Sequence, residues 1–310
     1  MVALIMAAIV LLAVFITVLS GGIKKEDGRL QIAASFYPVY SAVLRVTEGV
    51  DGVRVVNLTP SQTGCLHDYQ LTPDNVIALQ KADALVINGA GAESFLGDIG
   101  SNYPGLNVLD TSKGISLMEG GHDSEEHAQD EDGHGEYNEH IWTGPSSYIK
   151  QIKNLCDGLI GIDPTYADQY KANAGRYIRE IEDVKSRLIA AVDSLPTKSC
   201  ILFHGSLTYF AKELGLNPVA SLSMGEETAI SAADLADAAA KAKAAGKILL
   251  IYDDQYHAEY LTVARDAAYS RVLKLDTAVT GNGSDDRDSW ITAMRGNLRK
   301  IKEICEFSGE

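Results

Sequence analysis

Four histidines lie inside one acidic stretch of the sequence, which reads GGHDSEEHAQDEDGHGEYNEH at residues 120–140. The stretch also holds eight carboxylates and has no lysine or arginine. It cannot bury apolar surface, so we expect a solvated loop at residues 120–139. Acidic runs are usually plain solvated surface, whereas histidine-rich tracts are a sign of metal binding. The stretch is therefore either an acidic insert or a metal-collecting loop, and the other histidines must decide between the two.

Three histidines and one aspartate follow expected strands of the chain, at His67, His140, His204 and Asp276. In open α/β sheets, ligands bind outside the carboxyl ends of the strands, so these side chains belong to the same kind of crevice. A lone histidine in such a place is usually structural. Three imidazoles and one carboxylate together suit tetrahedral Zn(II). His257, in DDQYHAEY, follows its strand by several residues and is a poorer candidate.

The elements that must position these side chains alternate between strand-like and helix-like segments. The expected strands are LQIAAS, VRVVNLT, DALVINGAG and LNVLDTS in the first half, and SCILFHG, NPVASLS, KILLIYDD and RVLKLDTA in the second. Strands that alternate with helices in this way predict a mainly parallel sheet. The fold class is therefore α/β, with two four-stranded parallel-sheet domains.

A long helix is predicted between the two halves, beginning at Pro164 and ending at Pro196. Apolar residues recur along it at steps of three, four or seven, as on one face of a single helix. Its span of about 31 residues corresponds to roughly 46 Å, which is long enough to act as a rigid spine. The expected division is an N-terminal domain at 29–162, a linking helix at 163–196 and a C-terminal domain at 197–310, with the metal site in the cleft between the domains.

The charge of the chain restricts its partners. The formal net charge is −15, so a nucleic-acid partner, which would need a basic face, is not expected. Residues 1–19 are an uninterrupted apolar run, and we interpret residues 1–28 as an export signal or an N-terminal membrane anchor. The rest of the chain would then lie outside the cytoplasmic membrane. No cysteine follows the run at Ser20–Gly22, so lipidation is not expected.

The four cysteines, Cys65, Cys156, Cys200 and Cys305, are widely spaced and show no paired metal-ligand spacing. Four cysteines allow three pairings, and the sequence does not choose between these and free thiols. If one pair exists, Cys200 with Cys305 is the most plausible, because both lie in the C-terminal half.

Several motifs together resemble the metal-specific solute-binding proteins of bacterial ABC transporters, in particular the zinc-uptake members. They are ASFYPVYSAV, GCLHDYQLTPDNVIALQKADALVINGAGAESFL, the histidine-rich acidic loop, HIWTGP, the long linking helix and FHGSLTYFAKELGL. The resemblance extends over roughly residues 30–306. It implies a protein that captures Zn(II) as its transported ligand and delivers it to a membrane permease, and that works as a monomer.

The resemblance also implies roles for individual residues. His67, His140 and His204 match the metal ligands, and histidine at position 204 is the zinc-type residue where many manganese-type members carry glutamate. Asp276 matches a strand-end aspartate that is the fourth ligand in some members, while others use water or a glutamate. The usual Trp-Leu-Asp-Pro run reads WTGP here, which is a departure outside the ligand itself.

The loop lies directly before His140, which favours a metal-collecting loop over a plain acidic insert. Its histidines, His122, His127 and His134, would be tethered near the mouth of the site, where a flexible segment raises the local metal concentration. Three other readings stay open: a binding protein for manganese or another divalent metal, a surface adhesin, and a zinc hydrolase with three histidines and an open fourth position.

Overall fold

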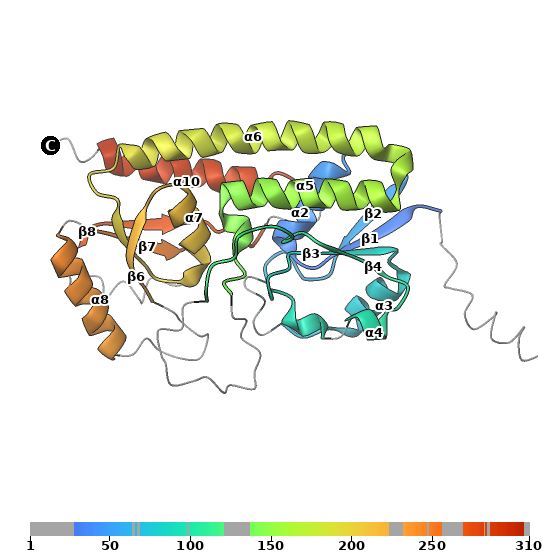
Figure 1. Cartoon of the computed structure of the whole chain (residues 1–310), viewed down its shortest axis with the longest axis horizontal. Helices are drawn as coiled ribbons and strands as arrows, with labels where there is room; N and C mark the ends of the chain where they lie inside the picture. The colour runs from blue at the N-terminus through green and yellow to red at the C-terminus, as the bar shows by residue number, and fades with distance from the viewer. Residues whose placement is uncertain are drawn as a thin grey trace, which may run out of the picture.

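The computed structural model of the chain contains two α/β lobes along one long helix (Figure 1). It describes residues 28–63, 66, 69–97, 99–120, 137–222, 232–246, 248–255, 269–281, 283 and 286–306. Each lobe holds one four-stranded sheet in which all paired strands are parallel. The predicted fold class is confirmed.

The N-terminal lobe is built on a sheet of order β2-β1-β3-β4. Its strands are β1 (Leu30–Ala34), β2 (Val53–Asn57), β3 (Ala84–Ile87) and β4 (Asn107–Asp110). The connections contain α2 (Tyr37–Val46), α3 (Pro73–Lys81), the 3-10 turn η1 (Ser94–Leu96) and α4 (Ile99–Asn102). Helix α3 begins at Pro73, because Thr72 and Asn75 form a reciprocal capping box around that residue.

The C-terminal lobe repeats this arrangement with the order β6-β5-β7-β8. Its elements are β5 (Ser199–Leu202), η4 (Gly205–Leu207), α7 (Thr208–Glu213), β6 (Asn217–Ser221), α8 (Ala232–Ala245), β7 (Ile248–Asp253), β8 (Tyr269–Leu275) and α10 (Ser289–Glu306). Pro218 is tolerated because β6 is an edge strand. In both sheets the chain changes direction beside the first strand, which creates a binding crevice at that strand's carboxyl end.

Helix α6 (Ala167–Asp193) runs along both lobes (Figure 1). Its 27 residues span about 40 Å, less than predicted, because Pro164–Tyr166 form the separate 3-10 turn η3. The predicted apolar stripe is buried, including Tyr177, Ile181 and Leu188. The helix packs against α2, α5 (Pro145–Ile162) and α10, so it contacts elements of both lobes.

The lobes are also joined at a second place. Residues 277–281 and 286–290, which we call the crossing segment, follow β8 and return the chain to the N-terminal lobe. Trp142 Nε1 donates a hydrogen bond to the Thr277 carbonyl oxygen at 2.9 Å, and Trp290 Nε1 donates to the Trp142 carbonyl oxygen at 2.8 Å. The Trp290 ring is stacked on Tyr148 of α5, with 4.6 Å between ring centroids. Two buried indoles therefore fasten the crossing segment to the N-terminal lobe.

Within the crossing segment, the backbone at Gly281 packs directly against Tyr37 of the N-terminal lobe. Its N–H donates to the Ser61 carbonyl oxygen at 2.9 Å, and its own carbonyl accepts from the side chain of Gln62. A Cβ at Gly281 would overlap the ring of Tyr37, so only glycine fits. The Tyr37 hydroxyl in turn donates to the Asp286 carbonyl oxygen at 3.1 Å. The chain segment that leads to residue 67 is thus tied to the C-terminal lobe.

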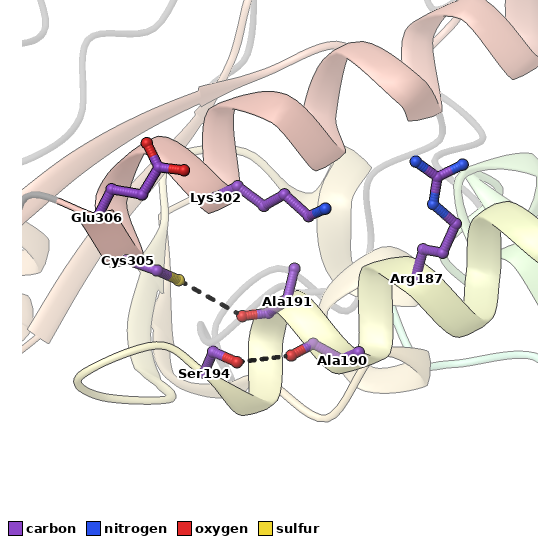
Figure 2. Close-up of a pocket in the computed structure, with 7 residues that line it drawn as sticks. All are labelled: Arg187, Ala190, Ala191, Ser194, Lys302, Cys305 and Glu306. Atoms are coloured by element: carbon purple, nitrogen blue, oxygen red, sulfur yellow. Dashed lines mark hydrogen bonds between the residues drawn. The ribbon is translucent and has the colours of Figure 1, made fainter.

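The sequence left pairings and free thiols open, with Cys200 and Cys305 as the most plausible pair if one existed. In the structure both thiols are free, and the thiol of Cys156 is free as well. Cys200 lies fully buried in the interior strand β5. Cys305 is on the last turn of α10, where its Sγ faces the backbone oxygen of Ala191 (Figure 2). Both residues belong to the C-terminal half, but that alone does not bring two side chains to bonding distance. Cys65 lies outside the described residues.

The apolar run at residues 1–19 also lies outside the described residues. Among the helices that the structure describes, none combines the length and the apolar character needed to cross a membrane.

Candidate metal centre

His140 and His204 lie next to each other although they come from different lobes. His140 is the residue before the turn η2 (Ile141–Thr143), at the start of α5, and His204 follows β5 and precedes η4. Both are buried, with 4% and 7% of their surface exposed. Their ring centroids are 5.4 Å apart and their planes are nearly perpendicular, at 88°. Residues 64 positions apart in the chain thus form one imidazole pair.

This spacing suits a shared metal ion. Two imidazoles on one tetrahedral Zn(II), with Zn–N distances of about 2.0–2.1 Å, place their ring centroids about 5 Å apart. The observed separation of 5.4 Å is close to that value. Trp142 lies on the other side of His140, with 5.1 Å between centroids, and Phe36 packs edge-on against Trp142. Aromatic side chains therefore form the dry side of the imidazole pair.

The two imidazoles differ in their hydrogen bonds. The Nδ1 of His140 is 3.1 Å from the side-chain oxygen of Asn138 and 3.5 Å from a carboxylate oxygen of Glu139. The Nδ1 of His204 accepts the backbone N–H of Ser206 at 3.1 Å. In a neutral imidazole an accepting Nδ1 leaves the proton on Nε2. Coordination through the Nε2 of His204 therefore requires this bond to Ser206 to open as the proton moves.

A buried carboxylate stands behind His204. Asp253, the last residue of β7, is fully buried, and its carboxylate accepts hydrogen bonds from Ser206 Oγ at 3.0 Å and Thr277 Oγ1 at 3.3 Å. Burial raises the pKa of Asp253 to about 6, although the N–H of Gln255 and the two hydroxyls partly offset this. Asp253 thus connects the loop of His204 to the start of the crossing segment.

The N-terminal lobe has a corresponding acid, Glu93, a partly exposed residue whose carboxylate points inward. Its carboxylate accepts from Ser35 Oγ at 2.8 Å, from the Asn88 N–H at 2.7 Å and from the Gly89 N–H at 3.1 Å. Burial raises its pKa to about 7, with the hydrogen bonds opposing that rise. Asn88 also donates to the carbonyl oxygen of Glu139 at 2.9 Å, directly before His140. Sequence reasoning missed both acids, because each also depends on a partner distant in the chain, Ser35 for Glu93 and Ser206 for Asp253.

Asp276 does not join the imidazole pair in this structure. Its carboxylate accepts the N–H of Ala278 at 2.7 Å, within its own loop, and Asn297 of α10 binds its backbone N–H at 2.9 Å. Asp276 faces Asp254 closely enough to raise the pKa of that residue, after the larger effect of burial. Across the described residues, no three His, Cys, Asp or Glu side chains are grouped as metal ligands.

Five predicted histidines lie outside the described residues: His67, His122, His127, His134 and His257. The four-ligand set of His67, His140, His204 and Asp276 therefore stays a prediction, of which the structure brings two members together.

The two ends of the acidic stretch are described. Glu119 and Tyr137 form an antiparallel bridge, and the Asn138 N–H donates to the Met118 carbonyl oxygen at 2.8 Å. The hydroxyl of Tyr209, from α7, accepts the Met118 N–H and donates to the Asn138 carbonyl oxygen, each at 2.9 Å. The loop thus begins and ends beside His140, against a residue of the C-terminal lobe. Tyr137 and Asn138, predicted as part of the loop, are paired with its base.

The structure explains the departure WTGP. Gly144 stands where an aspartate would cap the N-terminus of α5, and Glu213 of α7 supplies the carboxylate instead. Glu213 accepts the N–H groups of Ser146 and Ser147, the latter at 3.1 Å. A Cβ at Gly144 would lie 2.5 Å from the Glu213 carboxylate oxygen, so glycine at this position leaves room for Glu213. An anion at a helix N-terminus is favourable, and here it joins the two lobes.

One surface pocket is lined by none of these histidines. It is formed by the last turns of α6 and α10, where Arg187, Lys302 and Cys305 line a cavity of about 340 Å³ (Figure 2). None of the candidate metal ligands contributes to it.

Comparison with known proteins places the chain in a family. The family model described as zinc-uptake complex component A, periplasmic (ZnuA), matches residues 32–304. The chain belongs to this family. The zinc-binding lipoprotein AdcA of Streptococcus pneumoniae strain R6 is 26% identical over 92% of this chain, and the match covers 58% of AdcA. The chain therefore spans little more than half the length of that relative. The high-affinity zinc uptake system protein ZnuA of Bacillus subtilis is also 26% identical, over 91% of this chain and 90% of that protein.

Solved structures have the same fold. FpvC of Pseudomonas aeruginosa, in complex with Ni²⁺, has a TM-score of 0.74 at 22% identity, over 91% of this chain and 98% of that chain. A zinc-bound deletion mutant of ZnuA has a TM-score of 0.70 at 24% identity, over 88% of this chain and 97% of that one. At these identities the likeness establishes the fold alone.

Proposed function

We propose that this protein binds Zn(II) outside the cytoplasmic membrane and delivers it to an ABC transporter permease, as a solute-binding protein and not as an enzyme. The observation that carries the proposal is the imidazole pair, in which His140 and His204 reach one place from two lobes. Family membership supports the same function, since ZnuA of Bacillus subtilis is a zinc uptake protein.

In this proposal the ligands are His67, His140, His204 and Asp276. Borderline nitrogen donors favour Zn(II) over Mn(II), which prefers oxygen. For Asp276 to coordinate, its carboxylate would turn an oxygen toward the imidazole pair, and for His204 to coordinate through Nε2, its Nδ1 would give up the bond to Ser206. Loading therefore involves local rearrangement on the C-terminal side, whereas His140 stays in place. The loop histidines His122, His127 and His134 would collect zinc at the mouth of the site.

The decisive experiment measures metal content and preference together. Protein purified without added metal is analysed by mass spectrometry, and the metal-free protein is then titrated with Zn(II), Mn(II) and Ni(II) in competition. We expect zinc to be bound and to displace manganese at equal concentration. Nickel and manganese are included because FpvC structures contain these ions. Preferential retention of manganese would refute the zinc assignment.

Two variants test the site itself. His204→Ala should weaken zinc binding severely, because it removes a bond to the metal, and His140→Ala should do the same from the other lobe. Zinc binding of parental strength in His204→Ala would show that the two lobes do not share one metal. Hydrolase assays on metal-free and zinc-loaded protein provide the control against an enzymatic role, and we expect no difference between them.

A further inference from the structure

One buried amide lies between the two candidate ligands. Asn138 is 7% exposed, and its side chain bonds in both directions. Its Oδ1 accepts the backbone N–H of His140 at 3.0 Å and lies 3.1 Å from the Nδ1 of the same residue. Its Nδ2 donates to the carbonyl oxygen of Gly205, next to His204, at 2.8 Å. Asn138 is thus in contact with both ligand-bearing segments.

The contact with His140 has a chemical consequence. An amide oxygen only accepts hydrogen bonds, so the His140 Nδ1 must be the donor and must carry the ring proton. The lone pair of the neutral ring is then on Nε2, the nitrogen left for a metal. Metal-binding histidines generally have such a partner on the second nitrogen, which fixes the ring and its tautomer. The Glu139 carboxylate oxygen, at 3.5 Å, flanks the same nitrogen.

The contact with Gly205 links the segment that carries His140 to the segment that carries His204. A Cβ at Gly205 would lie 3.3 Å from the Asn138 Nδ2, so the small residue allows the amide to come close. The backbone of Asn138 is itself held by the Tyr209 hydroxyl and by Met118. The backbone of Asn138 is therefore held by contacts that involve no metal.

We propose that Asn138 is a positioning residue of the zinc site, which holds His140 as the Nδ1–H tautomer and keeps the His204 loop at the separation that one metal ion requires. This rests on the proposed function, in which both histidines bind the metal. Asn138 touches no metal in this role, because its two functions act through His140 and through the Gly205 carbonyl.

Two substitutions separate the functions. Asn138→Asp keeps an acceptor for the His140 ring but replaces the donor to Gly205 with an oxygen, whereas Asn138→Leu removes both bonds. The matched control is Asn173→Leu on α6. Asn173 is also 7% exposed, and its amide donates to the backbone oxygens of Val46 and Glu48, away from the histidines.

Each variant is measured in two ways. Imidazole ¹⁵N NMR of the metal-free protein reports the tautomer of His140, whose signal is assigned by its loss in His140→Ala, and a chromophoric chelator reports zinc affinity by competition. Asn138→Leu should lose the Nδ1–H tautomer and bind zinc about 10- to 100-fold more weakly. Asn138→Asp should keep the tautomer and still lose affinity. Asn173→Leu should lower the melting temperature and leave both other readouts unchanged.

The outcomes distinguish this inference from the proposed function. Unchanged zinc affinity in His140→Ala would refute the ligand assignment and, with it, the role of Asn138. If His140→Ala abolished binding while Asn138→Leu kept the parental tautomer and affinity, only the role of Asn138 would be refuted. Should Asn138→Leu not fold, Asn138→Ala, which adds no bulk, takes its place with the same expected results.

Discussion

Replacing Glu93 by glutamine should remove a pH dependence from the stability of the metal-free protein. The pKa of Glu93 is raised from an ordinary 4.5 to about 7, chiefly because its carboxylate is buried away from water. The hydrogen bonds from Ser35, Asn88 and Gly89 partly oppose this rise. An acid whose pKa is higher in the folded state stabilises the fold only while it is protonated. That contribution is complete below about pH 4.5 and is lost as the pH rises through 7.

The size of the effect follows from the same values. Each pKa unit corresponds to about 1.36 kcal/mol, so the rise from 4.5 to about 7 amounts to about 3 kcal/mol. Glutamine is neutral at every pH. The free energy of unfolding of the parent, minus that of Glu93→Gln, should therefore be about 3 kcal/mol lower at pH 8 than at pH 4.5.

Urea unfolding at pH steps between 4.5 and 8 measures this difference, with zinc removed by a chelator. The two tryptophans, Trp142 and Trp290, are buried and report unfolding by fluorescence. Other titrating groups are common to both proteins and cancel in the subtraction. Glu182→Gln, on the exposed face of α6, controls for the loss of a carboxylate at the surface. A parent-minus-variant difference that stays constant with pH would refute the account of Glu93.

Three further predictions concern the site and the connection between the lobes. Gly281→Ala should destabilise the protein by about 1–3 kcal/mol, because the new Cβ overlaps Tyr37. The control is Gly105→Ala, where a Cβ meets nothing within 4 Å and stability should not change. Thermal unfolding of both variants tests this. Zinc affinity should fall steeply between about pH 7 and pH 5, with more than one proton taken up per zinc released, because imidazoles must be neutral to coordinate. Competition titrations at stepped pH measure this, and a flat profile would exclude histidine ligands. Deleting residues 121–136 keeps the bridge between Glu119 and Tyr137, and it should remove weak zinc sites while leaving the tight one. Calorimetry measures both. Loss of the tight site would mean that one of its ligands lies in the loop.

Sequence patterns were sufficient for the elements whose signal is local. The eight strands and the buried stripe of α6 were predicted because apolar periodicity depends only on neighbours in the chain. The length of α6 was overestimated, since the sequence does not distinguish a 3-10 turn at Pro164–Tyr166 from the first helical turn. The proximity of His140 and His204 followed from one general rule, that ligands gather at the carboxyl ends of parallel strands.

What the sequence did not reveal depends on pairings between distant residues. Burial in the folded chain raises the pKa of Glu93, and its hydrogen bond from Ser35, which opposes that rise, comes from 58 positions away. No local pattern marks either residue. Asn138 was hidden because it lies within a stretch whose composition predicts a solvated loop. Glu213 of one lobe supplies the carboxylate at the helix end that Gly144 of the other lobe lacks. In the sequence alone, Gly144 looks like an unexplained departure and Glu213 like an ordinary helix residue.

The crossing segment restricts how an ion can enter and leave. Binding proteins whose lobes are joined at one flexible point can close around a ligand by hinge rotation. Here the lobes are joined along α6 and again at the crossing segment, and rigid rotation would break the bonds of Trp142, Trp290 and Gly281 together. In the proposed function, ion exchange would therefore proceed by local opening of the loops around the histidines, while the contacts of α6 stay closed. The free energy of that local opening would then set the residence time of the ion. Amide hydrogen exchange would detect the opening as rapid exchange of the Ser206 amide, while the amides of α6 stay protected.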